Sequence, residues 1–217
     1  MNVMIASPSY DGKVDVRHAI SLVETAKIGL SNGVNILPLY VSFDSMIQRA
    51  RNDVCKIFLQ SNASHLIFID CDQDWNPPDV FKLLSHNVPI VAAPIVKKND
   101  IPSYNVKLYG DYVVNNNGLV KVDGIGTGFM CIRRDAMEAL WNISDTYSDK
   151  ADEYSKNIFE IKIIDGKLFS EDMTFCEKWK KIGGEIFIDP SINCGHSGSK
   201  RWEGNFSEWI KIIKDTK

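Results

Sequence analysis

The chain has 217 residues, of which 44% are hydrophobic and 24% are charged, and its formal net charge is -3. This composition is typical of a globular domain with one well-buried core. The charge lacks the basic excess of proteins that bind nucleic acid, so we expect no nucleic-acid partner. No run of residues approaches the roughly 20 apolar residues that span a bilayer. The N-terminal residues also lack the basic and apolar regions of a signal peptide.

The cysteines indicate a reducing compartment. Their number is odd and no two of them form a CxxC pair, so neither a disulfide framework nor a zinc site is expected. We therefore expect reduced thiols and a cytoplasmic location. The five are Cys55, Cys71, Cys131, Cys176 and Cys194.

The first 95 residues alternate between strand-like and helix-like segments. Segment 65–70 is apolar almost throughout, which is typical of a strand buried on both faces. Asp44 is a candidate N-cap for the second helix, and Pro77 and Pro78 stand where prolines occur in a first helical turn. The predicted strands are 2–7, 34–41, 65–70 and 89–95, and the predicted helices are 15–31, 45–60 and 77–86.

This alternation predicts an α/β fold with a mainly parallel central sheet flanked by helices. In such sheets ligands lie beyond the carboxyl ends of the strands. That rule selects three segments as candidate ligand contacts before any chemistry is considered: 7–10, 42–44 and 70–75.

The second half predicts a smaller antiparallel part. Segment 103–122 has the pattern of a hairpin with an NNNG turn, and 159–169 has that of a hairpin turned at Asp165-Gly166. Segment 144–157 is polar and is predicted to be a mobile loop. The other predicted elements are a glycine-rich turn and strand at 124–134, helices at 135–141 and 170–184, a strand at 185–190 and a tail of loop and helix at 194–214.

The segment FIDCDQDW carries three carboxylates, at Asp70, Asp72 and Asp74, directly after the strand at 65–70. In an extended backbone the side chains of alternate residues point the same way. Crowded carboxylates repel one another unless a cation neutralises them. Oxygen ligands of this kind suit Mg²⁺ or Mn²⁺. We therefore favour a metal site over a solvated acidic turn.

Three other segments carry candidate chemistry. Glu171 and Asp172 open a predicted helix, where acids also occur simply because they stabilise the helix dipole, and a base for an acceptor hydroxyl is an equally good interpretation. His196 lies between glycines in a loop, where most histidines are surface residues, although imidazole also binds Mn²⁺. The glycines of segment 124–129 lack the spacing and context of a dinucleotide fingerprint, and they allow close backbone approach to a ligand.

The helix at 45–60 offers polar side chains on two faces. Arg49 and Asn52 share a face with Ser45, whereas Arg51 lies on another. The ordinary interpretation of such arginines is a solvated face of an amphipathic helix.

Taken together, these segments resemble the GT-A glycosyltransferases, most nearly the family-2-like and Anp1-like branch, which includes compact transferases encoded by large algal viruses. The resemblance covers nearly the whole chain. It rests on four elements in the family's order: IASPSYDG, SMIQRARN followed by HLIFIDCD, GTGFMCIRRDAM, and SEDMTFCEKWKKIGGEIFIDP.

The resemblance implies a single GT-A domain over 1–217, with a nucleotide-binding half at 1–100 and an acceptor-binding and catalytic half at 101–217. It implies that Asp172 is the catalytic base and that Glu171 contacts hydroxyl groups of the acceptor or donor. The implied nucleotide and donor contacts are Ser7, Pro8, Tyr10, Arg49, Asn52, Asp70, Cys71, Asp72 and Lys97. The implied pocket for the acceptor or sugar is Trp75, Gly126, Thr127, Gly128 and Trp202. The implied metal ligands are Asp70, Asp72 and His196, and Asp74 falls outside the usual pair.

The expected activity is transfer of a sugar, with inversion, from a nucleotide-sugar to a hydroxyl of a glycan or glycoprotein, with Mn²⁺ or Mg²⁺ as cofactor. UDP-sugars are the favoured donors and GDP-sugars the alternative. If the chain is viral, the expected location is the host cytoplasm. Two rivals remain: a sugar-phosphate nucleotidyltransferase, disfavoured by the single glycine after the first strand, and a nucleotide-sugar-binding module without catalysis.

Overall fold

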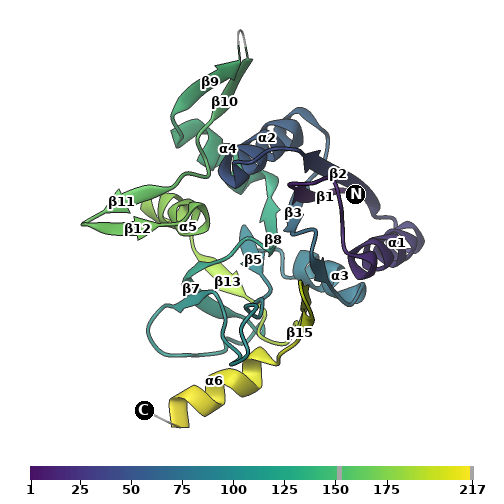
Figure 1. Cartoon of the computed structure of the whole chain (residues 1–217), viewed down its shortest axis with the longest axis vertical. Coiled ribbons are helices and arrows are strands. Elements are labelled where there is room, and N and C mark those ends of the chain that lie inside the picture. The colour runs from purple at the N-terminus through teal and green to yellow at the C-terminus, as the bar shows by residue number, and fades with distance from the viewer. Residues whose placement is uncertain (151–152, 216–217) are drawn as a thin grey trace.

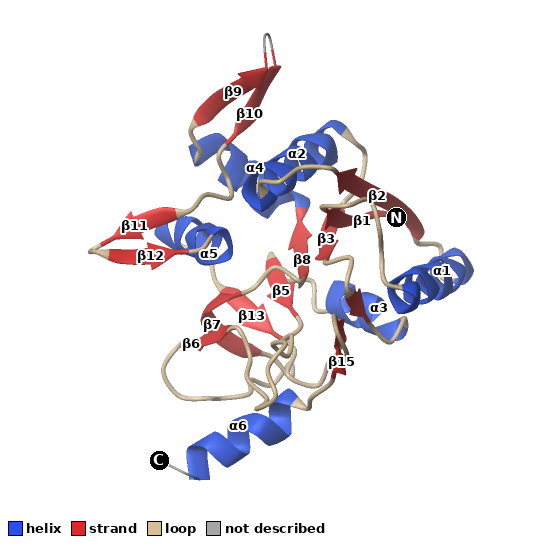
Figure 2. Cartoon of the chain, viewed as in Figure 1, coloured by secondary structure: helices blue, strands red, loops and turns tan. Residues whose placement is uncertain are grey.

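The computed structural model describes residues 1–150 and 153–215, and in this part of the chain eight strands form one central sheet (Figures 1 and 2). Across the sheet the strands are β2 (Asn35–Ser42), β1 (Asn2–Ser9), β3 (His65–Ile69), β8 (Phe129–Arg133), β5 (Ile90–Ala92), β13 (Ile186–Ile188), β7 (Val120–Ile125) and β6 (Val106–Leu108).

The strand directions confirm the predicted α/β class with a mainly parallel sheet. Strands β2, β1, β3, β5, β13 and β6 run one way, and β8 and β7 run the other way. The insertion of β8 between β3 and β5 has a consequence for the site. It brings the glycine-rich turn before β8 next to the carboxyl end of β3, where the amide of Asp70 donates to the carbonyl of Gly128.

Helices cover both faces of the sheet. On one face lie α2 (Ile47–Gln60), α4 (Arg134–Ile143) and α5 (Glu171–Lys181), and on the other lie α1 (Val16–Ser31) and α3 (Pro78–Ser85). Each face of the sheet has its own hydrophobic core: the first core lies under α2, α4 and α5, and the second lies under α1 and α3. Side chains alternate across a strand, so β1 supplies Met4 and Ala6 to the first core and Val3 and Ile5 to the second. Strand β3 is buried on both faces in the same way, as predicted.

The remaining elements lie outside the central sheet. Strands β4 (Gln73–Asp74), β14 (Gly195–Ser197) and β15 (Arg201–Trp202) form a three-stranded sheet. The hairpins β9–β10 (Thr146–Lys150, Glu153–Lys156) and β11–β12 (Lys162–Ile164, Lys167–Phe169) project from the body at the top and left of Figure 1, and α6 (Phe206–Asp215) lies at the bottom. No helix among the described residues combines the length and the apolar composition needed to cross a membrane.

Two sequence predictions were wrong. Segment 144–157 forms the hairpin β9–β10 and not a loop. Tyr147 and Tyr154 favour strands, and an exposed hairpin needs no apolar face. Residues 151–152 of that segment lie outside the described residues. Asp44 is not the N-cap of α2. Its carboxylate accepts from the amide of Met46, which is the N-cap, so the helix begins two residues later than expected.

The predicted hairpins have different turns. At β11–β12, Asp165 and Gly166 both have positive φ, as a type I′ turn requires, so that turn is confirmed. Strands β6 and β7 pair as predicted, but the NNNG residues lie inside a longer connection at 109–119.

Arg134 fixes the end of α2 against the start of α4. Its guanidinium donates to four main-chain carbonyls, those of Phe58, Leu59, Ser61 and Ala63, and lies 4.7 Å from the ring centroid of Phe58. These carbonyls lie in or just after the last turn of α2, where carbonyls lack the regular bond from a residue four positions later.

We expect Arg134→Met to lower the free energy of unfolding by about 2 kcal/mol, since hydrogen bonds from charged donors contribute about 1.5–3 kcal/mol. Urea denaturation measures this. The matched control is Arg133→Met, which removes a surface ion pair with Asp135 and should cost about 0.2–1 kcal/mol. An Arg134→Met loss as small as that of the control would contradict the role given to Arg134.

Candidate active site

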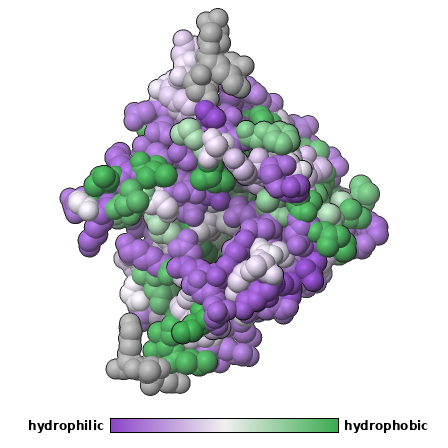
Figure 3. Space-filling model, in the orientation of Figure 1, coloured by the Kyte–Doolittle hydropathy of each residue, from purple (hydrophilic) through white to green (hydrophobic). Residues whose placement is uncertain are grey.

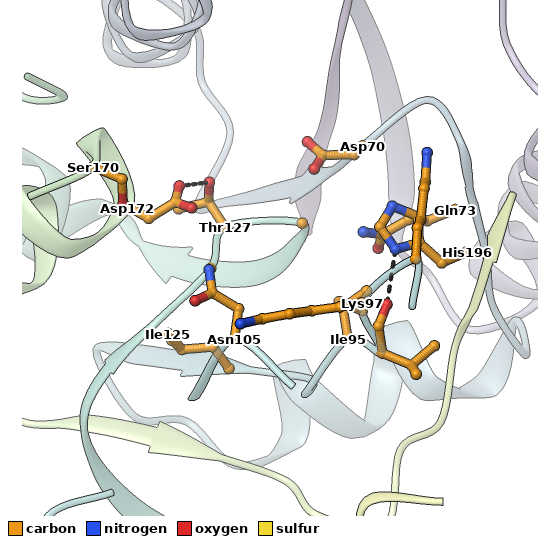
Figure 4. A pocket seen from close by; sticks show the side chains of 14 residues that line it. Asp70, Gln73, Ile95, Lys97, Asn105, Ile125, Thr127, Ser170, Asp172 and His196 are labelled. Carbon is orange, nitrogen blue, oxygen red and sulfur yellow. Dashed lines mark hydrogen bonds between the residues drawn. The ribbon is translucent and has the colours of Figure 1, made fainter. Parts of the chain in front are cut away.

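Two adjoining cavities lie beyond the carboxyl ends of β1 and β3. The larger, about 580 Å³, lies among the turn before β8, the segment after β5, the start of α5 and β14 (Figure 4). Its polar lining residues are Asp70, Gln73, Lys97, Lys98, Asn105, Thr127, Ser170, Asp172 and His196. The face drawn in Figure 3 is hollowed near its middle, and mostly hydrophilic residues border the hollow.

The smaller cavity, about 280 Å³, is lined by residues 8–10 at the end of β1, by the start of α2 and by residues 70–72. Pro8, Tyr10 and Cys71 all line it, and Tyr10 is 72% exposed at its edge. Asp70 lines both cavities, so they meet at the segment that carries Asp70 and Asp72.

Arg51 joins the two acidic segments of the site. Its Nη1 lies 2.7 Å from Glu171 Oε1 and 2.5 Å from Asp172 Oδ1, and its Nη2 lies 3.2 Å from Asp70 Oδ1. The side chain of Arg51 is only 5% exposed. Its assignment to a solvated helix face was therefore wrong.

The sequence contained a signal for this position. Arg51, Val54, Cys55 and Phe58 follow the spacing i, i+3, i+4, i+7 and form the buried stripe of α2. An arginine within such a stripe requires buried anionic partners. Three predicted site carboxylates supply them.

Burial and charge act in opposite directions on this cluster. Burial raises the pKa of Asp70, and the charges of Asp172 and Asp72 add to the rise, while Arg51 opposes it. Burial also raises the pKa of Glu171, with Asp172 adding and Arg51 opposing. Burial alone would lower the pKa of Arg51, but the three carboxylates raise it, so the guanidinium stays charged.

The carboxylate of Asp172 is held by one oxygen. Its Oδ1 accepts from Arg51 and, at 2.6 Å, from the hydroxyl of Thr127. Its Oδ2 faces Gly126, where an added Cβ would lie 3.6 Å from it, and the residue lines the larger cavity. Ser170 caps α5, so Asp172 lies in the first turn, where the helix dipole stabilises a carboxylate.

Asp72 and His196 lie together although they are far apart in the sequence. Strand β14 pairs with β4 so that His196 lies opposite Gln73, and the amide of Ser197 donates to the carbonyl of Asp72. His196 Nε2 is then 3.6 Å from Asp72 Oδ2. The Nδ1 of His196 is 2.8 Å from the carbonyl oxygen of Val96, which can only accept, so Nδ1 carries the proton and Nε2 faces Asp72.

The predicted metal ligands are thus brought together in part. Asp72 and His196 offer a carboxylate and an imidazole nitrogen with the second ring nitrogen already bonded, as in many metal sites. Asp70 instead contacts Arg51. Across the described residues, no group of three or more His, Cys, Asp and Glu side chains is placed to hold a metal.

Lys98 also contacts Asp72, with Nζ 2.5 Å from Oδ2. Although burial alone would raise the pKa of Asp72, hydrogen bonds from His196 and Lys98 lower it to about 2. Lys98 was not among the sequence candidates, whereas its neighbour Lys97 was, and both line the larger cavity. The sequence alone does not show which of two adjacent lysines faces the carboxylate.

Several other predicted residues act as supports in the structure. Asn52 exchanges two hydrogen bonds with the main chain of Phe159, and Arg49 pairs with Asp44. These bonds fix α2 to its neighbours. Asn52 and Arg49 line a separate cavity near β9 and not the two described above.

Two aromatic candidates also lie apart from the larger cavity's lining. Trp75 is buried in the core, and its Nε1 donates to Thr25. Trp202 lies opposite His196 on β15, half-buried against the first core. Asp74, the third carboxylate of the acidic segment, makes a two-bond ion pair with Arg201 that joins β4 to β15. Its role is therefore structural.

His18, which the sequence did not single out, holds the main chain of the acidic segment in place. It is fully buried, and its Nδ1 lies 3.2 Å from the carbonyl oxygen of Asp70 and 3.1 Å from that of Gln73. Its Nε2 contacts the hydroxyls of Tyr40 and Ser7, so Ser7 supports His18 and does not line either cavity. Burial lowers the pKa of His18, which keeps the ring neutral.

No protein-family model and no curated protein matches this chain. Among solved structures it is similar to A197 from STIV, with 16% identity, a TM-score of 0.58 and coverage of 95% of this chain and 91% of that chain. At this identity the likeness shows the fold alone. A glycosyltransferase involved in glycosylation of the major capsid of PBCV-1 matches with 14% identity and a TM-score of 0.37, and the match covers 70% of this chain and 68% of that chain. S. aureus TarS 1-349 in complex with UDP matches with 12% identity and a TM-score of 0.45, and the match covers 87% of this chain and 57% of that chain.

We expect Arg51→Met to lower the free energy of unfolding by about 3–5 kcal/mol at pH 8, because it leaves buried carboxylates without their cation. Loss of Arg51 removes the charge that opposes the raised pKa values of Asp70 and Glu171. These acids then bind protons more readily in the folded than in the unfolded state. The loss should therefore shrink as the pH falls from 8 to 5.

Urea denaturation at the two pH values measures this. Arg49→Met, which removes an ion pair on a different face of α2, is the control and should show a smaller and less pH-dependent loss. An Arg51→Met loss that is constant with pH would contradict the proposed charge balance.

Proposed function

We propose that this chain is a glycosyltransferase with the GT-A fold that uses a nucleotide-sugar donor. The observation that carries the proposal is the placement of Asp172 and His196 on opposite sides of one cavity, with Asp72 beside His196 (Figure 4). One side has a carboxylate oxygen suited to accept a proton. The other has ligands suited to a cation. Transfer from a diphosphate to a hydroxyl is assisted by both, because one accepts the proton of the hydroxyl and the other neutralises the leaving diphosphate.

The two cavities suggest how a donor binds. We place the nucleoside in the smaller cavity beside Pro8, Tyr10 and Cys71, and the sugar in the larger one beside Gly126 and Gly128. The diphosphate then crosses near Asp70, where the cavities meet. We propose a nucleotide-binding half at 1–100 and an acceptor-binding half at 101–217 in one domain. In support of this proposal, the residues that line the smaller cavity all come from the first half.

Asp72 and His196 would hold a divalent ion, Mn²⁺ or Mg²⁺. Imidazole among the ligands favours Mn²⁺. When bound, such an ion neutralises charge on the departing diphosphate. Asp70 lines the same cavity as His196 and would support the ion through water.

The protein's own residues then prepare the acceptor hydroxyl. Arg51 and Thr127 hold Asp172 by Oδ1, which leaves Oδ2 directed at the cavity. Asp172 Oδ2 takes the proton of the hydroxyl as its oxygen bonds to the anomeric carbon. The bond from that carbon to the diphosphate oxygen breaks on the opposite face, so the configuration inverts. Glu171, bonded to Arg51, keeps the guanidinium in place.

Gly128 is required where the donor sugar is placed. A Cβ at this position would come within 2.4 Å of Gln73 Nε2 and 3.2 Å of Asp70 Oδ2. The bare backbone lets the turn before β8 pass close to the acidic segment.

We propose a glycan or glycoprotein as the acceptor, and a UDP-sugar as the donor.

A panel of UDP- and GDP-sugars tests the activity. We expect hydrolysis of at least one donor in the presence of Mn²⁺, and loss of that hydrolysis with EDTA or Asp72→Ala, because the carboxylate and the ion act together. Chromatography of the released nucleotide measures it. Pyrophosphate release from a sugar phosphate and a nucleoside triphosphate would instead identify a nucleotidyltransferase, and donor binding without hydrolysis would identify a binding module.

We expect Asp172→Asn to lower kcat for transfer by about 10²–10⁴-fold, the usual contribution of a general base. The Kd for the nucleotide should stay within about twofold, since Asp172 faces the larger cavity and does not line the smaller one. Steady-state kinetics and calorimetry measure the two quantities. Asp123→Asn, which removes a part-buried ion pair to Lys180 of α5, is the control. Wild-type turnover in Asp172→Asn would exclude Asp172 as the base.

A further inference from the structure

Lys98 lies beside the proposed metal ligand Asp72, in a position that its neighbours fix. It belongs to the segment after β5, whose backbone folds back through a bond from the amide of Lys97 to the carbonyl of Ser103. The stem of Lys98 runs past Gly198, where an added Cβ would meet Lys98 Cδ at 3.4 Å and the ring of Trp202 at 2.9 Å. The lack of a side chain at position 198 therefore makes room for the ring of Trp202, and the stem of Lys98 lies beside the same glycine.

The charges around Asp72 explain why a cation is needed there. The Asp72 carboxylate carries a negative charge, and His196 Nε2 lies 3.6 Å from its Oδ2. The Lys98 ammonium, 2.5 Å from Asp72 Oδ2, supplies the positive charge. A divalent ion would require the same carboxylate oxygen.

We propose that Lys98 is a built-in competitor of the divalent ion at Asp72 and a ligand of the donor diphosphate once that ion is bound. The inference rests on the proposed function. Without a ligand the ammonium neutralises Asp72. When an ion and a nucleotide bind together, the ion takes the carboxylate and the ammonium contacts the diphosphate oxygens.

The side chain is suited to both positions. Lys98 is 35% exposed, and lysine has a flexible stem that ends in a compact charge, so a modest rotation moves Nζ within the larger cavity. An ammonium binds phosphate as a point charge and needs no fixed orientation. Lys98 therefore opposes binding of the ion alone and favours binding of the ion with its nucleotide.

The test is a pair of titrations on the full chain with Lys98→Met and Lys200→Met. Lys200 is the matched control because it is a nearby lysine that pairs with Asp100, outside the larger cavity. The electron paramagnetic resonance signal of free Mn²⁺ gives the affinity for the ion without nucleotide. Calorimetry gives the affinity for UDP at saturating Mn²⁺.

Without nucleotide, we expect Lys98→Met to bind Mn²⁺ about two- to fivefold more tightly than the wild type, as loss of a partly exposed ion pair implies. With Mn²⁺ saturating, we expect the same variant to bind UDP about two- to tenfold more weakly, because it lacks the ammonium. Lys200→Met should change neither affinity by as much as twofold. The opposite signs distinguish a competitor from a residue that merely supports the fold.

Mn²⁺ binding by Lys98→Met that equals the wild type or is weaker would overturn the inference, while leaving the metal site and the proposed function intact. Asp72→Asn should abolish Mn²⁺ binding in either background. Absence of Mn²⁺ binding in both the wild type and Lys98→Met would refute the metal site together with this inference. Hydrolysis of a nucleotide-sugar in EDTA would then show that the transferase function stands without the ion.

Discussion

The site depends on one buried cation. Arg51 contacts both the acid after β3 and the two acids that open α5. Those acids lie on segments that are remote in sequence, and their mutual repulsion would separate the segments without it. The cost of burying a guanidinium is offset because three carboxylates surround it. The spacing between the segment after β3 and the start of α5 is therefore fixed through a side chain of α2.

Much of the sheet is encoded locally. The apolar run of β3, the turn residues Asp165 and Gly166, and the capped start of α5 each carry enough information in a few neighbouring residues. The strands of the first half and the position of the acidic segment follow from such signals. The hairpin β9–β10 was missed because its strands are polar, and polarity separates buried from exposed residues better than strand from loop.

The contacts that complete the site are not local. Arg51, His18 and Lys98 reach the acidic segment from a helix stripe, a buried helix face and a loop. Their spacing along the chain says little about which strand end they will meet. The buried stripe of α2 could have identified Arg51, since a charged residue among Val54, Cys55 and Phe58 must have a partner. For Lys98 and Lys97, only the path of the loop distinguishes the two.

The pairing of β14 with β4 limits which changes in chain length the protein tolerates. His196 reaches Asp72 because it lies opposite Gln73 in a pairing of two residues on each strand. A shift by one residue turns every side chain of a strand to its other face. An insertion or deletion of one residue within β14 would therefore turn His196 away from Asp72. A connection outside the paired residues can absorb a change of length that the pairing itself cannot.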